Sequence, residues 1–463
     1  MKKTVALKGG SYAIALTVLV LALLIVVNIL AGALPANLTK LDISASKLYS
    51  ITSNTKAVVN ALEQDVTIYW IVQSGQEDAV IENLLSKYDS LSDLLHVEKK
   101  NPDVYPTFAQ QYTQETVSNN SLMVVSGEKY RYVPYSDIYV TQGSQFSYSY
   151  TTSFDGEGAI TSAIDYVVST ELPKLYLLEG HGESQLPESF QEQLEKENLE
   201  TENLSLLTVD EVPEDAAALL LYAPASDISK EEAQMLESYV QKGGKLLVLA
   251  GPVADGELTN LYGILETYGI TAAQGIVSEG DRSHYAFQAP YILLPELGDS
   301  DITAPLTEQN YYAIVPVAAG LQLGSDSRVT ALLTTTDSAY SKLSGYSQTT
   351  YEKEEGDIDG PFALGVDIAD GGELVFFTSS YLLEDMYNAY SSGANSDLVM
   401  NALSSLLGER QAMSIRSKSL NYNYLTISDS AASLLKLVMI GLVPMLYLAM
   451  GGAALWDKRR MQR

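Results

Sequence analysis

The sequence contains no cysteine and only three histidines, His96, His181 and His284. Without cysteine there is no disulfide framework, no thiolate catalysis and no cysteine-bound metal. The histidines are too far apart in the chain to predict a histidine-rich metal site. We therefore expect neither a metal nor any other cofactor.

Basic residues are also scarce, with 28 Lys and Arg against 58 Asp and Glu, which gives a formal net charge of −30. A nucleic-acid-binding surface needs positive charge to neutralise phosphates, so we expect no nucleic-acid partner. The same acidity argues against docking on anionic lipid head groups.

Sequence motifs for catalysis and phosphate binding are missing. There is no Gly-x-Ser-x-Gly nucleophile elbow. Gly243-Gly244-Lys245 lacks the upstream glycine and the following Ser or Thr of a phosphate-binding loop, and it follows a predicted helix. We interpret it as a helix stop and assign no catalytic residue.

Two long stretches carry no charge. One is the apolar run Ala13–Leu34, and the other is Leu437–Trp456. A helix of ~20 apolar residues crosses the hydrocarbon core of a bilayer, so we expect a transmembrane helix at each end. The alternatives are a cleaved signal peptide with Ala31-Gly32-Ala33 as its processing site, although the first run exceeds the ~7–15 residues of a signal core, and a buried core helix for the second.

Basic residues flank both predicted spans. Lys2, Lys3 and Lys8 precede the first, and the tail after the second contains Lys458 and Arg459. Positive flanks are retained in the cytoplasm, so both termini are expected there. The prediction is a two-pass cell-membrane protein whose large body lies outside the cytoplasm.

These patterns predict six segments. They are a cytoplasmic tip and transmembrane helix (1–35), an N-terminal extracytoplasmic α/β domain (36–172), a second α/β domain (173–410), a membrane-proximal stalk (411–433), a transmembrane helix (434–456) and a basic cytoplasmic tail (457–463).

The first of the two α/β domains is predicted from periodicity. Residues 66–72, 121–125 and 130–134 have the composition of strands. Helices are expected from Ser50 through Leu62, over 77–95 and over 159–168. The Ser-, Tyr- and Gln-rich stretch 135–153 is expected to be a loop.

The second domain alternates strands and helices. Strands are expected at 174–178, 217–222 and 245–250, with helices at 189–197 and 229–241; a strand at 372–378 and a helix at 397–407 extend the pattern. This alternation predicts βαβ units and a parallel sheet covered by helices. Ser229 and Glu232 match a capping box.

The candidate site is Gly180-His181-Gly182-Glu183, directly after the strand at 174–178. Open parallel sheets bind ligands at the carboxyl ends of their strands. His181 could act as a base oriented by Glu183, but no nucleophile accompanies it. The readings left open are catalysis, a ligand or interdomain contact, and a tight turn in which His181 is hydrogen-bonded locally.

Several other charged residues receive structural interpretations. Glu354–Gly360 is expected to be a solvated hairpin rather than a calcium loop, because it lacks the ligand register of an EF-hand. Asp385 and Asp397 are expected to cap helices, and His96 to cap a helix or lie on the surface.

Five features together resemble the extracytoplasmic auxiliary subunits of gliding-motility-type (GldG-like) ABC transport systems. They are Lys47–Ile51 with its following helix; Gly180–Glu183; Ser229–Glu232 through Leu249; Gly372–Ser380 with Asn395–Asp397; and an anchor at each end. Asp281–His284 departs from this pattern as a loop particular to this sequence. The resemblance implies a flavodoxin- or glutamine-amidotransferase-like domain without amidotransferase chemistry.

The resemblance also implies the partners, an ABC permease and an ATPase, with a possible envelope or small-molecule ligand. The predicted function is thus a non-catalytic, membrane-anchored accessory subunit of an ABC transport system. Two alternatives remain: an envelope hydrolase or amidotransferase-like enzyme that uses the Gly-His-Gly-Glu turn, and a glycan-binding surface module that uses the abundant tyrosines, 31 in all.

Overall fold

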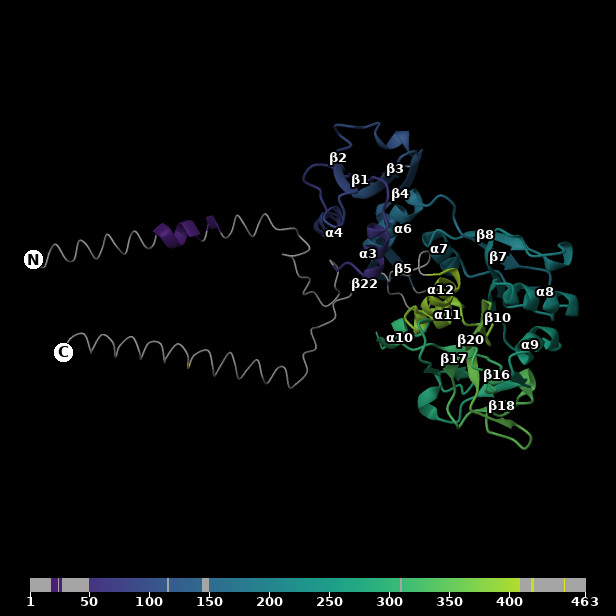
Figure 1. Ribbon diagram of the computed structural model, residues 1–463. Helices are drawn as coiled ribbons and strands as arrows, with labels where there is room; N and C mark the ends of the chain where they lie inside the picture. Colours follow the sequence, from purple (N-terminus) through teal and green to yellow (C-terminus); the bar gives the residue numbers. More distant parts are fainter. Residues whose placement is uncertain are drawn as a thin grey trace, which may run out of the picture.

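The structure is a computed structural model that describes residues 18–23, 25–26, 50–114, 116–143, 150–308, 310–408, 418–419 and 445. Figure 1 shows a small domain (residues 53–168) built around β1 to β4 and a large domain (residues 174–407) built around a wider sheet. The two meet where α6 (Gly156–Val168) lies against α7 (Glu188–Lys196).

The small domain contains a four-stranded sheet in the order β2-β1-β3-β4. Its strands are β1 (Val66–Ile71), β2 (Leu95–Lys100), β3 (Ser121–Ser126) and β4 (Lys129–Val133). Only β1 and β2 are parallel. The helices are α3 (Ser53–Asn60), α4 (Ala79–Asp89), α5 (Tyr135–Ile138) and α6, with a short 3-10 turn η1 (Ala109–Gln111). The core joins the sheet to α4 and α6.

Two predictions for this domain are wrong. The helix expected over 77–95 ends at Asp89, and Leu95–Lys100 forms β2 instead. The Asp89 carboxylate accepts a hydrogen bond from the Val97 N–H at 3.0 Å, so the chain turns back beside β1. β2 lies at the edge of the sheet, where charged side chains can reach solvent. Its sequence is therefore charged and lacks the apolar pattern that would have predicted a strand.

The stretch 135–153 is not a loop throughout. It contains α5 and β5 (Tyr139–Gly143), which pairs with β6 (Tyr150–Phe154). Tyrosine and threonine favour strands, and the Tyr139 ring packs 5.1 Å from that of Phe154. Lys418 and Ser419, in the expected stalk, form β22 on the other side of β6. The predicted domain boundaries stay predictions.

The large domain contains a ten-stranded mixed sheet in the order β11-β16-β20-β21-β10-β9-β7-β8, with β17 paired to β20 and β14 to β17. The strands are β7 (Lys174–Leu178), β8 (Glu200–Leu204), β9 (Ala216–Tyr222), β10 (Lys245–Leu249), β11 (Thr271–Ala273), β14 (Glu296–Leu297), β16 (Gly320–Gln322), β17 (Val329–Thr334), β20 (Ala363–Asp370) and β21 (Gly372–Phe377). The run β8-β7-β9-β10-β21 is parallel, as predicted. The remaining pairs are antiparallel.

Helices cover both faces of the parallel strands. Leu219 and Leu221 of β9 pack with α8 (Lys230–Gln241) and α9 (Thr259–Glu266). Leu220, on the opposite face, packs with α7 and α12 (Ala394–Leu407). Side chains alternate along a strand, so the uninterrupted apolar sequence of β9 is explained by burial on both sides.

The remaining elements form smaller additions to the large domain. They are the sheet β12 (Ile276–Ser278), β18 (Tyr340–Lys342) and β19 (Ile358–Asp359), the pair β13 (Ile292–Leu293) and β15 (Val315–Pro316), and helices α10 (Ala304–Glu308) and α11 (Asp385–Tyr390). Short 3-10 turns are η2 (Leu206–Thr208), η3 (Arg282–His284) and η4 (Gly345–Ser347).

Within the described residues, no helix is long and apolar enough to cross a membrane. The spans expected at residues 13–34 and 437–456 lie largely outside the described part of the chain.

Asp367 on β20 has a partly buried carboxyl group, and we expect it to make the stability of the protein depend on pH. Burial, reinforced by repulsion from Glu373, raises the pKa of Asp367 to about 6. The folded state therefore holds this proton more tightly than the unfolded chain, and the resulting stabilisation is lost as the pH rises from about 4 through about 6. Asp367→Asn should remove about 1–2 kcal/mol of this pH dependence, allowing for solvent screening.

Urea unfolding at pH 5 and pH 8 measures the effect, with the exposed Asp299→Asn as the control. An Asp367→Asn variant with the wild-type pH dependence would show that the Asp367 carboxyl does not titrate in this way.

Candidate functional site

The Gly-His-Gly-Glu turn follows β7 at the carboxyl edge of the parallel strands, as predicted. Gly180 and Gly182 have φ angles of +132° and +71°, which L side chains rarely adopt. A Cβ at position 182 would also lie 3.2 Å from the Ala225 Cβ. Both glycines are therefore required by the backbone path.

The turn is attached to the loop that follows β9. The His181 carbonyl accepts hydrogen bonds from the N–H groups of Ala225 and Ser226, both at 3.0 Å, and from the Ser226 hydroxyl at 3.1 Å. Ser184 donates its N–H to the Ala223 carbonyl at 3.2 Å. Two neighbouring strand ends are thus joined through backbone groups, which holds the turn in one conformation.

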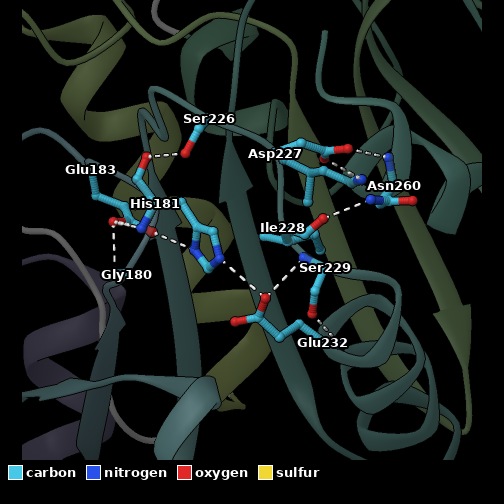
Figure 2. Close-up of polar contacts among 10 residues, drawn as sticks. Gly180, His181, Glu183, Ser226, Asp227, Ile228, Ser229, Glu232 and Asn260 are labelled. Carbon is cyan, nitrogen blue, oxygen red and sulfur yellow. Dashed lines mark hydrogen bonds and ion pairs between the residues drawn. The ribbon is translucent and has the colours of Figure 1, made fainter. Parts of the chain in front are cut away.

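Figure 2 shows the His181 ring between two glutamates. Nδ1 lies 3.2 Å from Oε1 of Glu183, and Nε2 lies 3.1 Å from Oε2 of Glu232. The three side chains are only 11%, 9% and 3% exposed, in that order. We name this arrangement the histidine clamp.

Each glutamate also accepts backbone hydrogen bonds. Oε2 of Glu183 accepts from the N–H groups of Gly180, at 3.0 Å, and His181, at 2.8 Å. Glu232 belongs to the predicted capping box of α8, in which its Oε2 accepts from the Ser229 N–H at 2.8 Å. The histidine clamp therefore connects the β7 turn to the N-terminus of α8.

Both ring nitrogens of His181 are engaged in the clamp. Both ring nitrogens face carboxylate oxygens, so both can donate only when the imidazole is doubly protonated. A general base needs a free lone pair within reach of a substrate. The nearby Ser226 hydroxyl donates to the His181 carbonyl and not to the ring, so the turn contains no serine–histidine pair.

Glu232 is the partner that sequence analysis missed. The capping box was recognised from Ser229 and Glu232, but 51 positions separate Glu232 from His181, and only tertiary packing brings them together. Oε1 of Glu232 is buried without a hydrogen-bond partner in the described structure. Alongside, the Asp227 carboxylate accepts from the N–H groups of Asn260 and Leu261 at the start of α9.

The side chain of a buried lysine, Lys342, contacts the acidic segment 354–360. Lys342 is fully buried, and its Nζ lies 2.6 Å from Oε2 of Glu354, 3.3 Å from Oδ2 of Asp357 and 2.7 Å from the Glu352 carbonyl. The carboxylates of Glu354 and Asp357 thus neutralise a buried cation. Among the described residues, no group of three His, Asp or Glu side chains could hold a metal ion.

The other predicted positions are surface or helix-end features. His96 lies on β2 with a side chain that is 52% exposed, 3.7 Å from Asp65. α8 ends before Gly243, whose φ is +105°, so the predicted helix stop is confirmed. Asp385 and Asp397 lie in the first turns of α11 and α12, but neither is the capping residue, so those two predictions are wrong.

Two parts of the chain match known families. Residues 172–369 match a family described as an ABC-type uncharacterized transport system, and residues 45–141 match a domain family of unknown function. The matched residues 172–369 include β7, β8, β9 and β10 of the parallel run, and the family is one of ABC transport auxiliary proteins. This confirms the resemblance at the level of the auxiliary family.

No curated protein matches the chain. Similar solved structures include the N-terminal domain of mmIFT52 (19% identity, 50% of this chain and 97% of that one, TM-score 0.38). Another is a ThuA-like protein from Parabacteroides merdae (9% identity, 53% of this chain and 93% of that one, TM-score 0.30). TM-scores this low do not establish a shared fold.

Removing the ring of His181 should destabilise the large domain. In His181→Ala, two buried carboxylates lose their shared partner, and the expected loss is about 1–3 kcal/mol in the free energy of unfolding. His96→Ala is the matched control; because that side chain is 52% exposed, its effect should stay within about 0.5 kcal/mol. Urea unfolding compares the two, and equal stabilities would contradict the clamp.

Proposed function

We propose that the chain is a non-catalytic accessory subunit of an ABC transport system of the gliding-motility type. It is held in the cell membrane by a helix at each end, with both termini in the cytoplasm and the two domains outside. Its partners are a permease and an ATPase. The match of residues 172–369 to an ABC transport auxiliary family supports the transport role.

One observation carries this proposal: the segment that follows the first predicted span and the segment that precedes the second both contact the small domain. The Thr52 N–H, just before α3, donates to Oε1 of Glu157 on α6 at 2.6 Å. Lys418 of β22 pairs with Phe154, at the end of β6 and immediately before α6. The segments that lead to the two predicted spans are thus tied within a few residues of each other, as a body attached to one membrane surface requires.

The apolar character of the first predicted span gives further support. Residues 18–23 are helical, and Val18, Leu19 and Leu23 are 61%, 65% and 62% exposed. A helix surface of this kind is unfavourable in water and suits a lipid or protein environment.

Two features of the sequence support an ATPase and a permease as the partners. The sequence contains no phosphate-binding loop, so energy from ATP must come from another subunit. In the second predicted span, Gly441, Gly451 and Gly452 would allow a neighbouring helix to approach closely. We assign the permease to this contact.

An enzymatic role for His181 is the rival function. The clamp argues against it, because both ring nitrogens are engaged and the adjoining Ser226 hydroxyl points to a carbonyl group. The buried position of the ring, 11% exposed, also limits its access to substrate.

Co-purification from detergent at native expression tests the proposal. The full-length chain should retain a nucleotide-binding ATPase and a polytopic permease, identified by mass spectrometry. A variant in which Gly441, Gly451 and Gly452 are all replaced by Leu should lose the permease while remaining in the membrane fraction, because the larger side chains separate the helices.

The matched control combines Leu435→Ala, Leu442→Ala and Leu446→Ala, which also changes three residues but on another face of the same predicted helix. This control should keep the permease, because the glycine face is unaltered. A full-length chain that purifies free of both partners would contradict the proposal.

A further inference from the structure

An open hollow of about 740 Å³ lies on the small domain, between the η1 segment and β4. Its volume falls within the ~300–1,000 Å³ typical of small-molecule sites. The lining is dominated by amide and phenol side chains, which include Gln110, Gln111, Gln114, Tyr112 and Tyr130. This hollow is separate from the histidine clamp, which belongs to the large domain.

A column of aromatic rings holds one wall of the hollow in place. It begins at Tyr69 on β1 and continues through Phe108 and Tyr112 to Tyr130 on β4, with ring centroids 4.9, 5.5 and 5.5 Å apart. Lys100 Nζ lies 5.0 Å from the Tyr69 ring and 5.4 Å from the Phe108 ring. Because each ring packs on the next, these contacts hold the Tyr130 ring in one position.

Tyr130 is nevertheless 44% exposed. A tyrosine ring that is fixed by its neighbours and open to solvent can stack on a ligand at little entropic cost, since its side chain has few rotatable bonds. Gln110, Gln111 and Gln114 are exposed beside it, and their amides make no hydrogen bond to the part of the chain that the structure describes. Each amide can both donate and accept.

Charge in the hollow is low and balanced. Arg131 and Asp137 also line it, one of each sign, and the Arg131 guanidinium lies 4.9 Å over the Tyr166 ring. The lining thus offers neutral donors and acceptors next to an aromatic face. A sugar ring is complementary to this lining. Its hydroxyl groups can bond to the amides, and its apolar face of C–H groups can stack on the aromatic ring.

We propose that the hollow is a binding site for a neutral oligosaccharide. Tyr130 stacks on a sugar ring, and the three glutamines bind its hydroxyl groups. An extended peptide along the edge strand β4 is the competing occupant, but it would need backbone pairing and side-chain pockets rather than a row of amides. The site gives a role to the segment 45–141, whose family has no known function, and does not depend on the transport proposal.

Calorimetric titration of the full-length protein tests the site. The probes are chitohexaose, cellohexaose and maltohexaose, and the detergent must carry no sugar head group, since such a head group would compete. We expect saturable binding of at least one of the three. Tyr130→Ala should weaken that binding about tenfold or more, Tyr130→Phe should retain it because the ring remains, and Gln111→Ala should weaken it severalfold.

Tyr312→Ala is the matched control, an exposed tyrosine of the large domain (52% exposed) that should leave the affinity unchanged. Melting temperatures of all variants are compared, so that a loss of binding is not confused with unfolding. The proposal is overturned if none of the three sugars binds, if Tyr130→Ala binds as tightly as Tyr312→Ala, or if only an unstructured peptide titrates into the hollow.

Discussion

The arrangement of the chain depends on α6 and its buried glutamate. Glu157 is 2% exposed, and its Oε1 accepts from the Thr52 N–H at 2.6 Å and the Thr55 hydroxyl at 2.9 Å. The Tyr88 hydroxyl donates to the Glu157 carbonyl at 3.0 Å. A carboxylate is costly to bury unless it is hydrogen-bonded, so these contacts hold the start of α3 against α6.

The same helix joins the small domain to the large one. The Lys196 ammonium of α7 pairs with the carboxylate of Asp155, just before α6, where burial raises the pKa of Asp155. Asn198 donates to the Ser162 carbonyl at 2.9 Å and to Oδ2 of Asp165 at 3.1 Å. α6 thus contacts both the entering segment and the large domain, and β6, which ends just before α6, pairs with the returning strand β22.

The sequence was sufficient where local signals and burial agreed. The apolar run of β9 predicted a strand covered on both faces, and the capping box at Ser229 located the start of α8. Prediction was wrong where polar strands depend on neighbours distant in the chain, as in β2 and in the β5–β6 pair. The position of His181 was predicted, but its contact with Glu232 was not, because no local spacing reports a contact between a turn and a distant helix.

The central claim is that both ends of the chain lie in the cytoplasm and the two domains lie outside. Because the chain has no cysteine, a single introduced cysteine is a unique label. In intact spheroplasts, a membrane-impermeant maleimide should label Glu355→Cys, an exposed position of the large domain, and should label Gln462→Cys in the tail only after lysis. Labelling of Gln462→Cys before lysis, or protection of Glu355→Cys until lysis, would contradict the account.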